Sequence, residues 1–350
     1  MNATALTASE FTATALTAPI ALTMGEPAGI GGEIALLAWQ RRRELPVPFF
    51  IIDDPERLTR LEATLGWDVP IRAIARPEEA AGIFADALPV LPMALPQPAT
   101  AGRLDPANAP AVIEAITRAV SLVRSHAASA MVTNPIQKET LYAAGFPYPG
   151  HTEYLAALAK VARPVMMLAG PELRVVPVTV HLALAEALAA LRTSDIVACG
   201  RITAEALKRD FGIERPRLAV AALNPHAGEH GALGREEIEI IAPAVEALAA
   251  AGIAVHGPAP ADTLFHPAAR RRHDAVLCMY HDQALIPLKT LDFEHGVNIT
   301  LGLPFVRTSP DHGTALDIAG RGIADPSSLL AALAQAAAMA ARRAALAATV

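Results

Sequence analysis

Three histidines stand at equivalent places, each at the end of a short apolar run of the sequence. The runs are residues 174–181, 217–226 and 274–281, and each ends in a histidine. Parallel α/β sheets bind ligands beyond the carboxyl ends of their strands, where three imidazoles can converge on one metal ion. A lone histidine near a core is usually structural, but three at equivalent strand ends favour a site. The pattern therefore predicts metal ligation by His181, His226 and His281.

Polar residues accompany two of these histidines. His226 lies within the sequence NPHAGE, and His281 is followed by Asp282 and Gln283. Such neighbours orient metal-bound imidazoles, and three protein ligands leave coordination positions open for substrate. Nitrogen ligands favour zinc, cobalt or nickel over calcium. An open site of this kind indicates catalysis rather than structural support.

A possible anion site follows the third histidine. Lys289 and Arg307 are cationic, Asn298 lies between them, and Arg307 stands in the apolar sequence LPFVRT. Surface charge is the simpler explanation for such residues, but the apolar context favours a buried site that holds an anion by charge-assisted hydrogen bonds.

A glycine-rich segment, MGEPAGIGGE from Met24, joins an expected strand to an expected helix. Its spacing is neither GxGxxG nor the Walker A pattern, because no Lys-Ser or Lys-Thr pair follows. A tight structural turn and a ligand-binding loop both remain open for this segment.

Alternating short apolar runs and longer helical patterns indicate the fold. Val112, Ile113, Ile116, Val120 and Val123 make one apolar stripe on an expected helix at 109–125. The proline-rich stretch 88–110 is expected to be a connector. The alternation predicts mostly parallel sheets in two α/β lobes with a cleft between them. Strands are expected at 19–24, 48–52, 128–133, 175–180, 218–223 and 275–280.

Composition excludes several classes of protein. The 350 residues are 53% hydrophobic and only 4% aromatic, which suits a large aliphatic core and two domains. A formal charge of −6 argues against nucleic-acid binding, and the arginine triplets at 41–43 and 270–272 are expected to be solvated helix surface. Cys199 and Cys278 are expected to be reduced thiols in the core of a cytoplasmic protein.

The two ends of the chain do not predict a membrane protein. Residues 1–17 lack a basic start and contain Glu10, so we expect a loose leader rather than a secretory signal. The alanine-rich end, residues 329–350, is interrupted by Arg342 and Arg343 and is expected to be a packed terminal helix.

Taken together, these motifs resemble the 4-hydroxythreonine-4-phosphate dehydrogenase family over residues 20–334. Five stretches carry the resemblance. Asn134 and Gln137, in TNPIQK, depart from the expected pattern, and the leader before Pro19 has no counterpart in the family. The stretches are MGEPAGIGGEI from Met24, GHTEYLA from Gly150, NPHAGEHGALGREE from Asn224, MYHDQALIPLK from Met279 and VNITLGLPFVRTSPDHGTALDIAG from Val297.

The resemblance implies a fold and a set of site residues. The fold is two α/β/α lobes with a central cleft, similar to isocitrate and isopropylmalate dehydrogenases. We expect a first lobe at 18–140 plus 305–350 and a second at 141–304, with the loose leader at 1–17 outside the family pattern. Asp262 and Asp282 would line the pocket and, with Lys289, are the candidates for catalysis; a helix cap is the alternative for Asp262. The implied metal ligands are again His181, His226 and His281, and the implied substrate contacts are His151, Thr152, Lys289, Asn298 and Arg307.

The resemblance also implies cofactors and partners. The run from Asp311 to Gly320 resembles an adenosine-binding loop, which would account for NAD use without GxGxxG; NADP is the alternative cofactor. One divalent metal per site is implied, with zinc, cobalt and magnesium as candidates. The family is homodimeric with its cleft at the subunit junction, so residues of both chains can complete one site. The implied cofactor contacts are His312, Gly313, Thr314 and Asp317.

The implied reaction is a metal-dependent oxidation in vitamin B6 synthesis. 4-Phosphohydroxy-L-threonine would become 2-amino-3-oxo-4-phosphooxybutanoate, which decarboxylates to 3-amino-2-oxopropyl phosphate. The hydroxyl proton would pass to Asp282 or to Lys289 through a water. Three alternatives stay open: a dehydrogenase of threonate or erythronate phosphate, a metal hydrolase, and a non-catalytic phosphate-binding module. NAD binding discriminates the dehydrogenases from the hydrolase.

Overall fold

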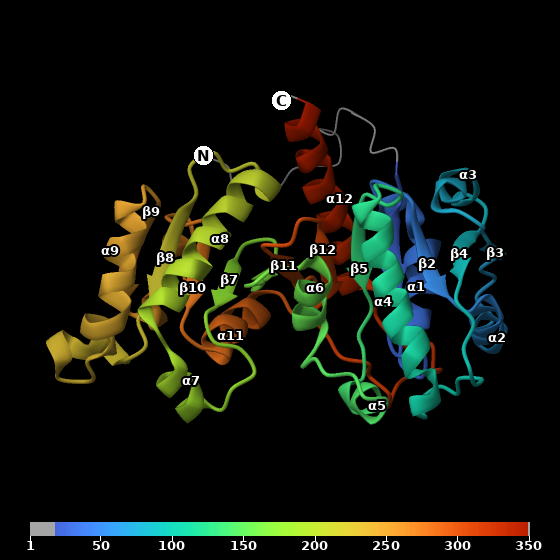
Figure 1. Ribbon diagram of the computed structural model, residues 1–350, viewed down its shortest axis with the longest axis horizontal. Coiled ribbons are helices and arrows are strands. Elements are labelled where there is room, and N and C mark those ends of the chain that lie inside the picture. The colour runs from blue at the N-terminus through green and yellow to red at the C-terminus, as the bar shows by residue number, and fades with distance from the viewer. Residues whose placement is uncertain (1–17, 349–350) are drawn as a thin grey trace. The chain divides into compact units, whose positions relative to one another are not determined.

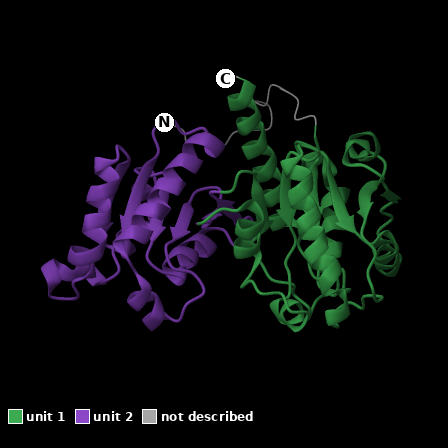
Figure 2. Cartoon of the chain, in the orientation of Figure 1, with its two compact units in different colours: residues 1–162, 303–350 green, residues 163–302 purple. Residues whose placement is uncertain are grey.

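The computed structural model describes residues 18–348, so the leader expected at 1–17 lies outside the described part of the chain. The chain forms two compact units (Figure 2). Among the described residues, unit 1 contains 18–162 and 303–348, and unit 2 contains 163–302. The chain therefore leaves unit 1 once and returns to it.

The strands of unit 1 all run parallel to their neighbours. Their order is β3-β4-β2-β1-β5-β12. Helices follow most strands, as βα crossovers require. The elements of unit 1 are β1 (Ile20–Thr23), α1 (Gly31–Gln40), β2 (Phe49–Asp53), α2 (Pro55–Leu65), β3 (Ile71–Ala73), α3 (Ala80–Ile83), β4 (Leu88–Pro92), α4 (Ala109–Arg124), β5 (Ala130–Thr133), α5 (Lys138–Ala143), α6 (His151–Ala159), β12 (Arg307–Pro310) and α12 (Ser327–Ala348), with short 3₁₀ turns at Arg42–Glu44, Pro77–Glu79 and Pro106–Asn108.

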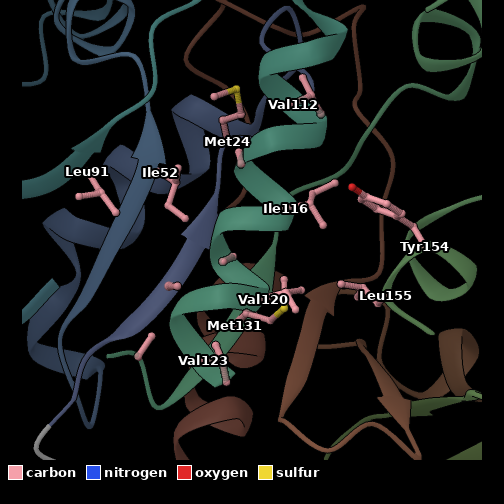
Figure 3. Close-up of a cluster of buried hydrophobic side chains, with 14 of the residues drawn as sticks. Met24, Ile52, Leu91, Val112, Ile116, Val120, Val123, Met131, Tyr154 and Leu155 are labelled. Carbon is pink, nitrogen blue, oxygen red and sulfur yellow. The ribbon is translucent and has the colours of Figure 1, made fainter. Parts of the chain in front are cut away.

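Helix α4 shows how the apolar stripe builds the core of unit 1. Val112, Ile116, Val120 and Val123 are all buried, and they belong to one cluster of buried side chains with Ile52, Met131 and Leu155 (Figure 3). Burying one such side chain contributes about 1.5–3 kcal/mol. The predicted helix and its apolar face are both confirmed.

The expected connector at 88–110 contains a strand. Residues 88–92 form β4, which pairs with β2 and β3, and Val90 is fully buried between them. The prolines of β4 signal a loop in the sequence, because proline cannot donate to a sheet. The strand is nevertheless formed because Leu88 and Met93 supply backbone N–H donors at its two ends, to Pro70 and Asp53.

Unit 2 has a mixed sheet. Its strand order is β11-β6-β7-β10-β8-β9, in which β7, β10, β8 and β9 are parallel and β6 runs antiparallel to β7 and β11. Its elements, seen in Figure 1, are β6 (Val165–Ala169), β7 (Arg174–Pro177), α7 (Leu184–Ala190), α8 (Thr193–Phe211), β8 (Arg217–Ala221), a turn at Pro225–Gly231, a π-helical turn at Glu237–Ile241, α9 (Ala242–Ala250), β9 (Ala254–Ala259), a 3₁₀ turn at Ala261–Thr263, α10 (Pro267–Arg270), β10 (Ala275–Cys278), α11 (His281–Leu291) and β11 (Val297–Leu301).

All six expected strands are present, and both cysteines are buried free thiols. Burial raises the pKa of Cys199 to about 11, because the thiolate is desolvated, and raises the pKa of Cys278 above its usual range for the same reason. Both thiols therefore stay protonated and unreactive near neutral pH, as a core position requires.

The C-terminal helix α12 packs on the sheet of unit 1. By length and composition alone this helix could cross a membrane. However, it contacts β12, β5 and α1, and Leu329, Leu333 and Ala336 are fully buried or nearly so. The hydroxyl of Thr308 on β12 also donates to the carbonyl of Ala332, 2.8 Å away. The helix is thus a core element of unit 1, as expected.

The observed unit boundary differs from the expected one at 140/141. Residues 141–162 belong to unit 1 because α6 packs on α4: the Thr117 and Tyr154 hydroxyl oxygens lie 2.8 Å apart. The Phe146 ring packs edge-on against Tyr154 and the Tyr148 ring lies tilted to it, with ring centroids 4.9 and 5.2 Å from that of Tyr154. The contact between Thr117 and Tyr154, which are 37 positions apart in the sequence, thus ties this aromatic cluster to α4.

Candidate active site

The three predicted metal ligands follow three adjacent strands of unit 2. His181 follows β7, His226 follows β8, and His281 begins α11 directly after β10. Strand β10 lies between β7 and β8 and is parallel to both. The carboxyl ends of these strands therefore share one edge of the sheet.

His181 and His281 lie together at this edge. Their ring centroids are 5.9 Å apart, and both line a pocket of about 240 Å³. Nδ1 of His281 lies 2.7 Å from a carboxyl oxygen of Asp282, an arrangement that fixes the ring and leaves Nε2 for a ligand. The other lining residues are Thr179, Leu182, Leu184, Ala187, Tyr280 and Asp282.

His226 does not join this pair. It begins a turn with left-handed backbone, in which φ is 53° at His226, 54° at Ala227, 41° at Glu229 and 58° at His230. Each non-glycine residue in this region costs roughly 1–2 kcal/mol. Over residues 18–348, no group of three or more histidine, cysteine or acidic side chains is arranged to hold a metal ion. A single chain therefore brings two of the three predicted ligands together.

A buried carboxyl holds the His226 turn in this conformation. Glu237 accepts hydrogen bonds from the backbone N–H groups of Leu223 and Asn224, at 2.8 and 2.7 Å. A Cβ atom at Gly228 would lie 2.7 Å from Oε2 of Glu237, so only glycine fits there. Backbone strain that is held in this way often marks a functional loop.

Arg307 and His151 form the centre of a second set of predicted residues, in unit 1. Arg307 begins β12, is 3% exposed, and donates through Nη2 to the hydroxyl of Thr133, 2.6 Å away. Burial lowers the pKa of Arg307 to about 10, against an opposing effect of Glu153, so the guanidinium stays charged near neutral pH. Burial and the charge of Arg307 hold the pKa of His151 well below its usual value.

His151 is therefore neutral near pH 7. It begins α6, and its Nε2 atom is covered from solvent and has no hydrogen-bond partner among the described residues. Thr152 is half-buried beside it. A charged guanidinium next to an unsatisfied imidazole nitrogen suits an anionic group that accepts hydrogen bonds from both.

The remaining predicted substrate and catalytic residues lie in unit 2. Lys289 is on α11, with Nζ 5.2 Å from the ring centroid of Phe293. Asn298 is on β11, and its buried Oδ1 has no partner among the described residues. Asp262 is exposed in the turn after β9, and it is not among the residues that line the pocket of His181 and His281.

The predicted cofactor loop, residues 311–320, is held at its start and its middle by hydrogen bonds. The backbone N–H of Asp311 donates to Oγ of Ser328 at 3.0 Å, and the hydroxyl of Thr314 donates to Oε1 of Gln137 at 3.3 Å. The carbonyl of Thr314 accepts from the N–H of Ile30 at 3.0 Å. Gly313 and Asp317 remain exposed, which leaves them accessible to a ligand.

The glycine-rich segment is a close-packed turn in this structure. A Cβ atom at Gly29 would lie 2.8 Å from the carbonyl oxygen of Thr314, and one at Gly25 would lie 2.6 Å from that of Pro135. Nδ2 of Asn134 donates to the carbonyl of Gly31 at 3.2 Å. The glycines thus allow the turn to fit between the segment around Thr314 and the segment around Pro135. Asn134 contacts this turn and Gln137 contacts Thr314, so both residues have packing roles.

Sequence reasoning missed three buried polar residues around this turn: Glu26, Glu33 and Arg57. Arg57 donates to the carbonyl of Pro27 and pairs with Asp53, with Nη1 2.6 Å from Oδ2. Glu26 accepts from the N–H of Ala28 and from a threonine hydroxyl, and burial raises the pKa of Glu26. For Glu26 and Glu33 the sequence signal was a charge in an otherwise apolar segment, whereas Arg57 stands among other charged residues and had no such signal.

Comparison with known proteins identifies the family. The model of the pyridoxal phosphate biosynthetic protein PdxA family matches residues 45–336. The chain belongs to this family. A 4-hydroxythreonine-4-phosphate dehydrogenase from Caulobacter vibrioides is 59% identical over 93% of this chain and 98% of its own length, and one from Bradyrhizobium diazoefficiens is 53% identical over 93% and 98%.

A solved structure of a 4-hydroxythreonine-4-phosphate dehydrogenase is also similar to this chain. The 4-hydroxythreonine-4-phosphate dehydrogenase of Klebsiella pneumoniae matches with a TM-score of 0.81 and 38% identity, over 92% of this chain and 99% of that one. The PdxA match includes every candidate site residue from His151 to Asp317. The family assignment, the enzyme class and the α/β fold expected from the sequence are thus confirmed.

Proposed function

We propose that this protein catalyses the NAD-linked oxidation of 4-phosphohydroxy-L-threonine at C3, giving a β-keto acid that loses carbon dioxide. Membership of the PdxA family, with relatives of this name at more than half identity, carries the proposal. The buried guanidinium of Arg307 supports it, because a charged group with planar donors that Thr133 holds in place is suited to bind an anionic substrate.

The phosphate group would bind at Arg307 and His151. The guanidinium offers planar, paired donors, and the neutral imidazole can donate from one nitrogen without adding a second charge. Thr152, which follows His151 on α6, would make a further contact with the substrate. Remote contacts of this kind hold the reacting carbon in place for hydride transfer.

The residues at the strand ends of unit 2 fit a divalent metal in part. His181 and His281 are adjacent and face one pocket, and Asp282 orients one ring. We assign His226 as the third ligand, and we propose that a homodimer completes the site with residues of both chains. A metal bound there, with zinc, cobalt and magnesium as candidates, would lower the pKa of the substrate hydroxyl and polarise the developing carbonyl.

Proton transfer needs a group that is close to the substrate hydroxyl. Asp282 lines the pocket of His181 and His281. Lys289 lies on the same helix, α11, but is not among the residues that line this pocket. Either would accept the hydroxyl proton, Lys289 through a water, while hydride leaves C3. Asp262 would contribute only if the loop after β9 closes on the pocket.

NAD would bind at the loop 311–320. The exposed carboxyl of Asp317 is suited to accept hydrogen bonds from ribose hydroxyls, and the exposed backbone at Gly313 allows close approach of the cofactor. The two free, buried thiols support a cytoplasmic location.

Turnover by purified protein tests the proposal. Divalent metal is removed and restored, and NADH formation is followed with 4-phosphohydroxy-L-threonine and, in parallel, with threonate and erythronate phosphates. We expect metal-dependent turnover of the threonine derivative. Preference for a sugar-acid phosphate would replace the substrate but keep the chemistry, whereas no NAD reduction with any of the three would reject the dehydrogenase.

A further inference from the structure

Glu33 is a buried carboxyl in an apolar helix. It lies in the first turn of α1, in the sequence GGEIALLAW, and it is fully inaccessible to solvent. Its two carboxyl oxygens accept hydrogen bonds from the backbone N–H groups of Gly320 and Gly322, the second at 3.1 Å. A buried carboxyl without such donors would be strongly destabilising, so these two bonds account for its position.

The two glycines present their N–H groups because of their backbone conformation. Both lie in the left-handed region, with φ of 76° at Gly320 and 68° at Gly322. Backbone N–H groups of such turns converge on one concave face and bind anions. Here the anion is the side chain of the protein's own Glu33, and it holds the end of the loop 311–320.

The same helix holds the middle of that loop. The N–H of Ile30, the residue that precedes α1, donates to the carbonyl of Thr314, as described above. The start of α1 therefore contacts the loop at two points. Asp317 lies between Thr314 and Gly320, and Gly313 directly precedes Thr314. Both residues are exposed. The backbone that carries them is thus held at Thr314 by Ile30 and at Gly320 by Glu33, and Glu33 itself is fully buried.

We propose that Glu33 is a positioning residue for the nicotinamide cofactor, and that it acts by fixing the loop 311–320 in its binding conformation. The inference rests on the proposed function, because it takes this loop as the cofactor site. Small displacements of binding groups have large effects on affinity and rate. Loss of one of the two carboxyl acceptors is expected to weaken NADH binding about tenfold, which corresponds to about 1.4 kcal/mol.

The test compares two carboxyl-to-amide variants of the full chain. Glu33→Gln places an amide N–H₂ against a backbone donor. Glu237→Gln makes the same change to a buried carboxyl that also accepts two backbone N–H groups, but in unit 2. NADH affinity is measured by its fluorescence without substrate, and the KM for NAD and kcat are measured separately. Thermal unfolding is followed for each variant.

The expected result is a rise in the Kd of NADH and in the KM for NAD of about tenfold in Glu33→Gln, with kcat at saturating NAD nearly unchanged. Glu237→Gln should keep the wild-type Kd for NADH whatever its turnover. Equal NADH affinity in wild type and Glu33→Gln would overturn the inference while leaving the proposed function intact. A wild-type chain that does not bind NADH would overturn the proposed function and the inference with it.

Hydrogen exchange tests the same point if Glu33→Gln fails to fold. In the wild-type protein, NADH should slow exchange of the backbone amides across residues 311–322, including those of Gly320 and Gly322. Unchanged exchange of these amides at saturating NADH would overturn the proposed role of Glu33.

Discussion

Arg307 and Thr133 join the neighbouring strands β12 and β5 through a side-chain hydrogen bond of 2.6 Å. The bond is buried, and it fixes a guanidinium that stays charged although it is almost inaccessible to solvent. A cation that is held in this way is preorganised for an anion, because little conformational entropy is lost when the anion binds.

Replacement of Arg307 is expected to affect substrate binding first. Arg307→Lys keeps the charge but loses the planar pair of donors, and the KM for the phosphorylated substrate should rise at least about tenfold. The KM for NAD should change little. Steady-state kinetics with each substrate varied in turn check this expectation, with Arg118→Lys, at the surface of the same unit, as the control. An unchanged substrate KM in Arg307→Lys would remove Arg307 from the substrate site.

Metal binding is expected to require the paired histidines. His181→Ala and His281→Ala should each lower the metal content of the purified protein and abolish turnover without unfolding it. The control is His295, whose exposed imidazole is hydrogen-bonded to Asp292. His295→Ala should leave the metal content unchanged. Elemental analysis and circular dichroism provide the two measurements. Full metal content in His281→Ala would show that this histidine is not a ligand.

The ion pair of Arg57 and Asp53 is expected to be important for stability. Both side chains are buried, so Arg57→Met leaves an unpaired carboxyl in the core and should lower the free energy of unfolding by about 3–5 kcal/mol. Arg60→Met, in the exposed pair with Glu56 on the same helix, should change it by less than about 1 kcal/mol. Urea unfolding of the two variants gives the comparison. Similar losses in both would contradict the distinction between buried and exposed pairs.

The stability of the protein is expected to fall in mild acid because of His273. Burial, the nearby His256 ring and the charge of Arg217 lower the pKa of His273 to about 4, against an opposing effect of Asp274. The unfolded chain takes up this proton near pH 6.5, so stability is present above pH 6.5 and is lost as the pH falls toward 4. The loss should reach roughly 3 kcal/mol.

His273→Leu tests this origin of the acid sensitivity. The variant cannot take up the proton, so its free energy of unfolding should depend less on pH between 6.5 and 4 than that of the wild type. Replacement of the exposed His266 by Ala should leave the dependence unchanged. If the slope of unfolding free energy against pH is the same in His273→Leu and wild type, other groups cause the loss.

Local sequence patterns were sufficient to predict most elements. The period of the apolar residues identified α4 and the strands, because one buried face requires side chains at a fixed spacing. The three histidines were identified because each stands at the end of one of the apolar runs. Strand β4 was missed because its prolines are typical of a loop. Its pairing with β2 and β3, which a local pattern does not show, makes it a strand.

The sequence by itself determined the family, the fold class and which residues can do chemistry, since these depend on residue types and on short-range spacing. The tertiary structure decided which residues meet: Glu33 binds Gly320 across 287 positions of the chain, and His181 meets His281 while His226 stays apart. Such contacts arise when crossovers bring distant strand ends to one edge of a sheet, and no local pattern encodes their geometry.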